Sequence, residues 1–170
     1  TFPLPEAQLD RFLLRVRLGS PSVSDEIRVL DDQQIQHPIE TLTPVVKLKE
    51  ILQAADDVKH IYVSPAVKRY VVELTTRTRQ SEDVYLGASP RGSLALSRAG
   101  QARAAMLGRD YVLPDDVQAL AVPILAHRII VSPAARLRDL SSDRIVNEAV
   151  HATSVPGGEF SSEPIKRKTR

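Results

Sequence analysis

The sequence contains no cysteine, which excludes a disulfide scaffold, a zinc site built on thiolates and a catalytic thiol. Tryptophan is also absent, and aromatic residues make up only 4% of the 170 residues. Proteins that bind single-stranded nucleic acid need exposed rings on which bases stack, so this composition argues against that class. No apolar run approaches the roughly 20 residues of a membrane span, and the chain shows no secretory signal. We therefore expect a cytoplasmic protein without a membrane span.

The net charge of +2 lies in the last residues of the chain. From Gly157 onward four basic residues stand against two acidic ones, so the residues before Gly157 sum to zero. A basic tail can contact nucleic acid or acidic lipid, but a solvated end is the simpler interpretation. We expect a flexible basic tail at residues 156–170 and assign it no function.

Motifs that would carry catalysis within the chain are scarce. None of the seven glycines begins a phosphate-binding G-x-x-x-x-G-K-[ST] loop, and the four histidines lack metal-ligand spacing. No serine elbow or triad is present. The paired carboxylates Asp115 and Asp116 fall at an expected helix start, where capping explains them best. We predict no metal site.

The first 30 residues predict a short helix, a strand and a second helix. Pro5 suits the first turn of a helix over residues 6–10. Residues 13–18 alternate apolar and basic side chains, as a half-buried strand does, and Ser24 can cap a helix over residues 24–30. This is the only strand that the pattern predicts. Because a lone strand cannot satisfy its backbone hydrogen bonds, it either joins a partner's sheet or belongs to a fragment, which we favour.

A linker is predicted at residues 31–44, followed by a small helical bundle. The first helix of the bundle runs from Val45 to near Val58, and a polar loop is expected at residues 76–83. Serine–proline pairs predict three helix starts, at Ser64, Ser89 and Ser132. The second helix carries apolar side chains at helical spacing, which we expect to be buried. The third helix ends at Gly108, and the fourth starts at Pro114 and is kinked by Pro123. A further short piece covers residues 143–150.

Arg91 lies in the first turn of the predicted third helix. Free backbone N–H groups in a first helical turn favour an anion, and a guanidinium beside them completes a phosphate-binding corner. The alternative is a solvated arginine that tolerates an unfavourable helix dipole of roughly 0.3–1 kcal/mol. Local sequence does not separate the two.

Arg11 follows Asp10 at the junction of the first helix and the predicted strand. An arginine at such an end can project outward and stabilise a transferring phosphoryl group in a neighbouring subunit. The alternative is an ion pair with Asp10 or Glu6, which contributes less than about 1 kcal/mol if exposed.

Three stretches of the chain together resemble one family. They are TFPLPEAQLDRF at residues 1–12, GASPRG at 87–92, and GRDYV, PDDV and AHRI between 108 and 129. The first is similar to the segment that follows sensor 1 in the MoxR family of AAA+ ATPases, the second to its sensor 2, and the others to its lid helices. The resemblance extends to about Val150 and covers only the C-terminal half of such a protein.

The resemblance implies a mainly α fold, a helical lid preceded by the end of an α/β P-loop core. It places the end of the core, including the last strand, at residues 1–30 and the lid at 45–155, on either side of the linker at 31–44. The tail at 156–170 has no counterpart in the family. It implies that Arg11 is an arginine finger acting in trans and that Arg91 is sensor 2, which contacts ATP phosphates. The complete protein would then hydrolyse ATP with Mg²⁺, bound mainly by residues outside this sequence, and this chain alone, without Walker A and Walker B motifs, would be inactive.

The same resemblance implies an oligomeric ring, expected to be a hexamer, and a chaperone-like or metal-insertion role toward proteins with von Willebrand factor type A domains. It implies no nucleic-acid partner. Ser97, Gly100 and Leu113 depart from the family pattern, and the glycine and the missing cap would each cost about 1 kcal/mol of lid stability. The competing interpretation is a non-enzymatic helical module that binds DNA or protein. A DNA-binding module needs a basic stripe along one helix, and the predicted helices carry mixed charges instead.

Overall fold

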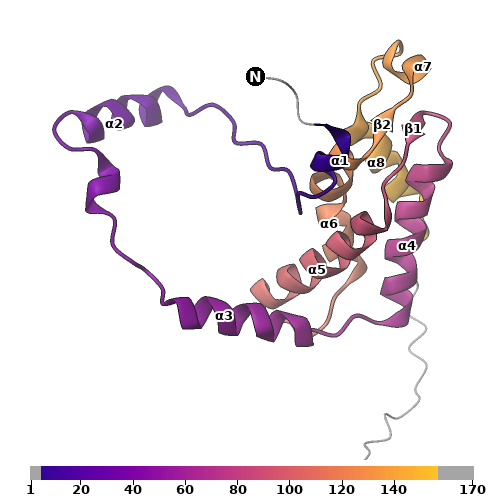
Figure 1. The fold of residues 1–170 in the computed structure, drawn as a ribbon, viewed down its shortest axis with the longest axis horizontal. Helices are drawn as coiled ribbons and strands as arrows, with labels where there is room; N and C mark the ends of the chain where they lie inside the picture. The colour runs from indigo at the N-terminus through magenta and orange to yellow at the C-terminus, as the bar shows by residue number, and fades with distance from the viewer. Residues whose placement is uncertain (1–4, 157–170) are drawn as a thin grey trace, which may run out of the picture.

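The computed structural model describes residues 5–156 and is mainly helical (Figure 1). A compact bundle is formed by α4 (Pro65–Gln80), α5 (Pro90–Met106), α6 (Pro114–Leu125) and α8 (Ser142–Ala152). The helices α5 and α6 pack closely together, and α8 packs against α4 and α6. The short helices η3 (Ala126–Arg128) and α7 (Pro133–Arg136) complete this lid, and the predicted tail from Gly157 onward lies outside the described residues.

The predicted helix starts and the predicted buried stripe are confirmed. Ser64, Ser89 and Ser132 each cap a helix that begins with proline, and each hydroxyl accepts a backbone N–H of the first turn. The stripe of α4 is buried because its side chains recur at helical spacing and face α5 and α8. Its members are Val67, Tyr70, Val71 and Leu74. Gly108 ends α5 with a φ of +71°, a conformation that glycine adopts without strain.

The polar loop predicted at residues 76–83 is wrong, because α4 continues to Gln80. The pattern also missed a strand pair, in which β1 (Val84–Leu86) runs antiparallel to β2 (Ile130–Val131). Thr75 and Thr78 are polar in the sequence yet fully buried, because their hydroxyls donate to carbonyls of the preceding turn. Hydrogen bonds inside the helix thus let polar residues extend α4 where we expected a loop.

The strand predicted at residues 13–18 is also wrong, since these residues are irregular. Within the described residues their one backbone hydrogen bond to the bundle runs from the Arg15 N–H to the Pro123 carbonyl at 2.9 Å. Alternation alone cannot make a strand where no neighbouring strand accepts its ladder. The short helix before it is confirmed as α1 (Glu6–Leu9). The next helix, α2 (Val23–Gln33), is capped by Ser22 and not by Ser24.

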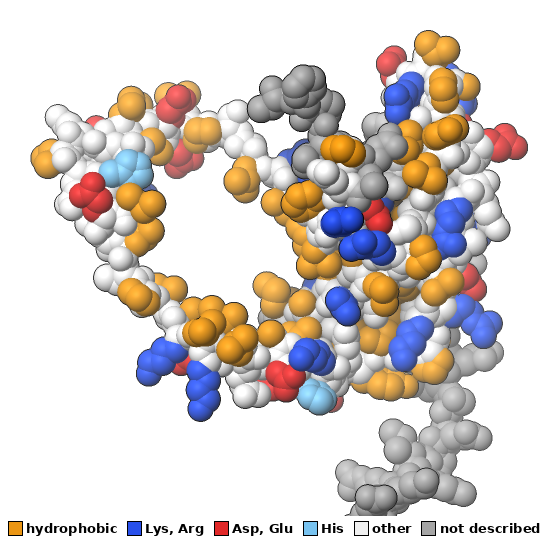
Figure 2. All heavy atoms as spheres, in the orientation of Figure 1, with side chains coloured by type: hydrophobic (Ala, Val, Ile, Leu, Met, Phe, Trp, Pro, Cys, Tyr) orange, Lys and Arg blue, Asp and Glu red, His pale blue; other side chains and the backbone are white. Residues whose placement is uncertain are grey.

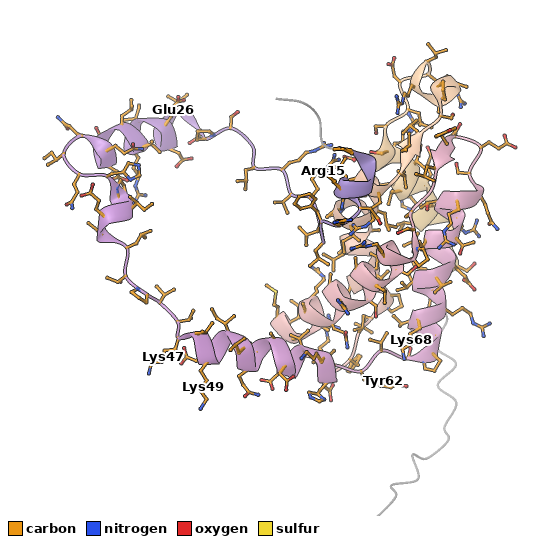
Figure 3. All side chains as sticks on the ribbon, in the orientation of Figure 1. Arg15, Glu26, Lys47, Lys49, Tyr62 and Lys68 are labelled. Carbon is orange, nitrogen blue, oxygen red and sulfur yellow. The ribbon has the colours of Figure 1, made fainter. Side chains whose placement is uncertain are left out.

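Residues 16–57 form an arc that leaves the lid and returns to it (Figure 1). After α2 the arc contains η1 (Pro38–Thr41), inside the predicted linker, and α3 (Leu48–Asp57), which η2 (Val58–His60) extends. Every side chain of the arc is exposed, including the apolar stripe of α3, where Leu48 is 72% and Leu52 62% exposed. Figure 3 shows Lys47 and Lys49 projecting away from the lid. Hydrophobic side chains gather along the arc and along the edge of the lid that faces it (Figure 2).

Two departures from the family pattern have structural explanations. A Cβ on Gly100 would lie 3.2 Å from Cγ1 of Val112, so the glycine permits a close approach between α5 and the following loop. Leu113 offers no capping oxygen to α6, but the Asp116 carboxylate accepts the Leu113 N–H at 2.8 Å. No helix among residues 5–156 is both long and apolar enough to cross a membrane.

Candidate functional site

The start of α5 is held rigidly by α4. The Ala88 N–H donates to the Thr78 hydroxyl at 3.1 Å, and the Ala88 carbonyl accepts from Arg79 Nε at 2.9 Å. Gly87 makes this approach possible, because a Cβ there would lie 2.6 Å from the Arg79 Cα. These contacts place Ser89 and Arg91 at a defined point, with Ser89 Oγ accepting the Arg91 N–H at 3.2 Å.

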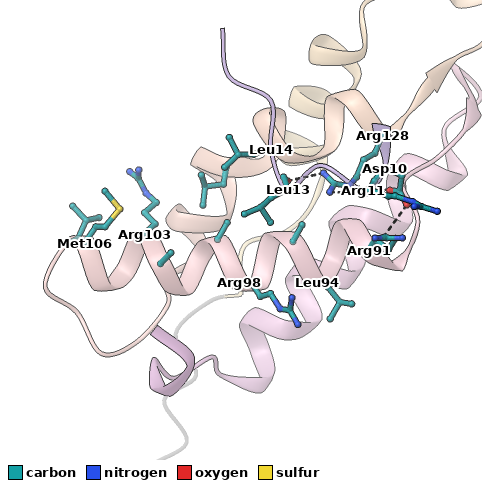
Figure 4. A pocket seen from close by; sticks show the side chains of 15 residues that line it. Asp10, Arg11, Leu13, Leu14, Arg91, Leu94, Arg98, Arg103, Met106 and Arg128 are labelled. Carbon is teal, nitrogen blue, oxygen red and sulfur yellow. Dashed lines mark hydrogen bonds and ion pairs between the residues drawn. The ribbon is translucent and has the colours of Figure 1, made fainter. Parts of the chain in front are cut away.

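An open groove of about 860 Å³ runs along α5 from its first turn to its last (Figure 4). Figure 4 shows Asp10, Arg11, Arg91 and Arg128 gathered at one end, and Met106 at the other. The charged end therefore joins the segment after α1 to the start of α5 and the end of α6. The remaining lining is largely apolar and comprises Leu13, Leu14, Leu94, Ala95, Ala99, Ala102, Leu107 and Leu120, together with Arg98 and Arg103.

Asp10 is the anion at the start of α5. Ser89 Oγ donates toward both oxygens of the Asp10 carboxylate, at 3.2 and 3.1 Å. The carboxylate also lies 3.7 Å from Arg91 Nε and 3.3 Å from Arg128 Nε. A negative charge at a helix N-terminus between two guanidinium groups is electrostatically favourable. The corner predicted to hold an anion thus holds a carboxylate of the chain itself.

Arg128 is the buried member of this group, with its side chain 2% exposed. Its guanidinium donates to the main-chain carbonyls of Asp10 at 3.4 Å, of Leu13 at 3.1 Å and of Phe12. Burial lowers the pKa of Arg128 from its ordinary value and Arg91 lowers it further, whereas Asp10 opposes the shift. An arginine titrates so far above neutral pH that the group stays charged.

His127 lies beside this guanidinium. Its Nε2 is 2.9 Å from Arg128 Nη1, a donor, and 3.2 Å from the Phe12 carbonyl oxygen, and its Nδ1 is 3.2 Å from the Pro123 carbonyl oxygen. Burial lowers the pKa of His127 below 6.5, the Phe12 carbonyl opposes the shift, and the neighbouring Arg128 charge adds to it. These contacts give His127 a structural role.

The structure brings the two sequence-predicted residues to one end of the groove. Arg91 is 58% exposed on its side chain, and Arg11 is exposed as well. The ion pair suggested between Arg11 and Asp10 is not formed, because Asp10 pairs with Arg91 and Arg128 instead. The Glu6 side chain, the other suggested partner, lies outside what the structure describes.

Sequence reasoning missed Asp10 and Arg128 as members of this site. Their contacts join residues more than 110 positions apart, which no local pattern reveals. The one signal available was the AHRI stretch within the resemblance. The structure adds the contacts of Arg128 with Asp10, Phe12 and Leu13.

Two exposed guanidinium groups beside a helix N-terminus can bind a polyanion such as a phosphate chain. Among residues 5–156, no group of three His, Asp or Glu side chains could hold a metal ion. The arrangement thus offers charge stabilisation and positioning.

Comparison with known proteins shows which family the chain resembles. Residues 76–149 match the family model of the AAA lid domain. The chain is 46% identical over 156 residues to the uncharacterized protein YeaC of Bacillus subtilis, covering 92% of this chain and 49% of that protein. It is 30% identical over 164 residues to the chaperone MoxR1 of Mycobacterium tuberculosis, covering 91% of this chain and 43% of the chaperone.

The protein MoxR of Paracoccus denitrificans is 34% identical over 154 residues, which cover 79% of this chain and 45% of that protein. A crystal structure from Cytophaga hutchinsonii, assigned as an ATPase, superposes with a TM-score of 0.83 at 27% identity, over 92% of this chain and 50% of that one. The chain thus spans about half the length of the proteins that it matches. It carries an AAA lid domain and is a relative of the MoxR-type AAA+ ATPases.

Proposed function

We propose that this chain is the lid portion of an ATP-hydrolysing MoxR-type ring, together with the end of its α/β core. In the complete protein Arg91 contacts the phosphates of ATP bound by its own chain. Arg11 is the arginine finger and acts on ATP bound by the adjacent subunit. The observation that supports contact with phosphates is the placement of both arginines, exposed, at one end of a single groove. Their assignment to ATP of two different subunits rests on the resemblance to the MoxR family.

The contacts of Arg91 and Arg11 support separate roles for the two residues. Arg91 lies on the helix whose first-turn N–H groups favour an anion, and its present partner is the Asp10 carboxylate at 3.7 Å. A phosphate carries more charge than a carboxylate and can compete for the same donors. Arg11 belongs to a segment outside the lid bundle, so its exposed guanidinium is available to a neighbouring subunit.

The exposed apolar arc supports the assignment of residues 1–30 to the end of an α/β core. Large apolar side chains left in solvent on this scale indicate a surface that another domain covers. We propose that these side chains pack on the rest of the core in the complete protein, which binds Mg²⁺ with ATP. They include Leu18, Val23, Ile27 and Leu30, which are 55–93% exposed.

We further propose that the complete protein assembles as a hexamer in the cytoplasm and acts as a chaperone or metal-insertion helper. Its clients would carry von Willebrand factor type A domains. The support is the relationship to proteins named MoxR, one of which is named a chaperone.

The test is ATP turnover by the complete protein with Arg11→Ala, measured over a range of protein concentrations. An arginine finger contributes roughly 10³-fold or more to kcat, so we expect kcat to fall by that order while ATP binding is retained. Arg17→Ala is the matched control, because Arg17 lies on the same segment and is 72% exposed.

An experiment that mixes two variant subunits tests the finger role more directly than a single variant. Subunits with Arg11→Ala and subunits that cannot bind ATP should each be inactive alone, and together they should recover turnover at the interfaces where an intact finger faces bound ATP. Turnover by Arg11→Ala at the wild-type rate would exclude the finger role.

A further inference from the structure

The buried guanidinium of Arg128 holds the backbone on both sides of Arg11. Its donors reach the carbonyls of Asp10, which immediately precedes Arg11, and of Phe12 and Leu13, the two residues that follow it. The Arg11 side chain itself is exposed. The contacts of Arg128 therefore fix the base of that side chain without touching its tip.

Other contacts hold the ends of this stretch on the lid. The Arg15 N–H donates to the Pro123 carbonyl at 2.9 Å, Arg15 and Arg17 lie 3.4 and 3.2 Å from the Asp143 carboxylate, and the Asp10 carboxylate contacts the start of α5. The Arg11 and Phe12 N–H groups bond only within the last turn of α1, to Gln8 and Leu9. The carbonyl oxygens of Asp10, Phe12 and Leu13 face η3, where Arg128 donates to all three and His127 Nε2 lies 3.2 Å from the Phe12 oxygen.

The packing around Arg128 makes this contact rigid. A Cβ on Gly92 would lie 3.6 Å from the Arg128 Cδ and 3.0 Å from the Leu125 Cδ2, so the first turn of α5 closes directly over the arginine stem. The carbonyl of Ile124, one turn earlier, accepts from the same guanidinium. A planar fork held at its stem directs its N–H groups along fixed lines, which a flexible ammonium cannot do.

We propose that Arg128 is a positioning residue for Arg11, and that through Asp10 it ties the finger to the helix that carries Arg91. The position of the lid then determines how far the Arg11 side chain extends into the neighbouring subunit. A movement of the lid that follows phosphate release at Arg91 moves Arg11 with it. This inference rests on the proposed function, since it needs Arg11 to act on ATP.

The test uses Arg128→Lys in the complete protein. Lysine keeps a positive charge beside Asp10, but its single nitrogen cannot serve three carbonyls along the backbone in the geometry of the fork. Because misplacement by about 1 Å can cost roughly 10²-fold in rate, we expect kcat to fall by that order with KM for ATP within about twofold. Arg144→Leu is the control, since Arg144 is an exposed arginine on α8 that pairs with Glu148.

A purely structural role would not reproduce two further results. In an Arg11→Ala background, Arg128→Lys should cause no additional loss of kcat, because the residue acts through Arg11. Amide hydrogen exchange at Arg11, Phe12 and Arg15 should speed up in Arg128→Lys, while exchange in the core of α4 stays slow.

The outcomes separate this inference from the function on which it rests. If Arg11→Ala turns over ATP at the wild-type rate, both fail. If Arg11→Ala lowers kcat by about 10³-fold but Arg128→Lys retains wild-type kcat, or lowers kcat further in the Arg11→Ala background, the finger stands and the positioning role is overturned.

Discussion

At the scale of single residues, one of the two carboxylates predicted to cap a helix start is buried in the lid. Asp116 is 2% exposed, and Arg109 donates to both of its oxygens at 2.8 and 2.7 Å. Burial raises its pKa, but the hydrogen bonds from Arg109 and from the Leu113 N–H outweigh burial and hold the pKa below 3.8. The expected capping role is therefore present, and a buried ion pair is added to it.

Asp116→Asn tests this ion pair. The amide keeps an oxygen for the Leu113 N–H but loses the charge that faces Arg109, so we expect a loss of about 2 kcal/mol in the free energy of unfolding at pH 7. Urea titration followed by circular dichroism measures it. Asp115→Asn is the control, because Asp115 lies beside Asp116 without a side-chain hydrogen bond among the described residues.

The same pair predicts how stability depends on pH. A carboxyl whose pKa is lowered on folding stabilises the native state above its unfolded pKa, here 3.8. That contribution is lost as the pH falls through the native pKa. The difference between wild type and Asp116→Asn should thus be full at pH 6 and shrink below pH 4. A constant difference would mean that the charge of Asp116 does not stabilise the fold.

At the scale of elements, the connection from β1 to α5 positions the start of α5 and Arg91. Arg79 of α4 lies under Gly87 and bonds the Ala88 carbonyl, so the helix that carries Arg91 starts at a point set by α4. The polar side chains of Thr78 and Arg79 make these contacts. A polar pattern of this kind predicts a loop, although α4 continues to Gln80.

Gly87→Ala should therefore destabilise the lid. The new methyl would lie 2.6–2.7 Å from Arg79 backbone atoms, which cannot move without shifting α4, so we expect a loss of about 1–3 kcal/mol. Gly19→Ala is matched, since nothing lies within 4 Å of its Cβ, and should change stability by less than about 0.5 kcal/mol. Equal effects in chemical denaturation would show that the close approach does not matter.

At the scale of the whole molecule, the segment at residues 10–15 docks on the lid through polar contacts more than through an apolar core. Arg128 donates to the Leu13 carbonyl at 3.1 Å, and His127 Nε2 lies 3.2 Å from the Phe12 carbonyl oxygen. Protonation of His127 would place a second cation 2.9 Å from Arg128 Nη1.

We therefore expect docking to weaken in acid. A histidine whose pKa is lowered on folding binds its proton more readily in the undocked state, so stability falls as the pH drops below 6.5. His127→Gln, which keeps polar atoms but does not titrate, should remove this dependence. The free energies of unfolding of the two proteins, compared between pH 5.5 and 7.5, measure this dependence. Parallel curves would contradict a lowered pKa of His127 in the folded protein.

The sequence by itself determined the helices of the lid, their serine–proline starts, the stop at Gly108 and the place of Arg91 in a first helical turn. These depend on groups within four residues of one another, so local pattern predicts them. Only the tertiary structure decided that residues 13–18 are irregular, that Asp10 fills the anion corner, and that Arg128 holds the backbone around Arg11. A strand needs a neighbour and a buried guanidinium needs distant acceptors, and which groups meet across more than 100 residues is set by packing alone.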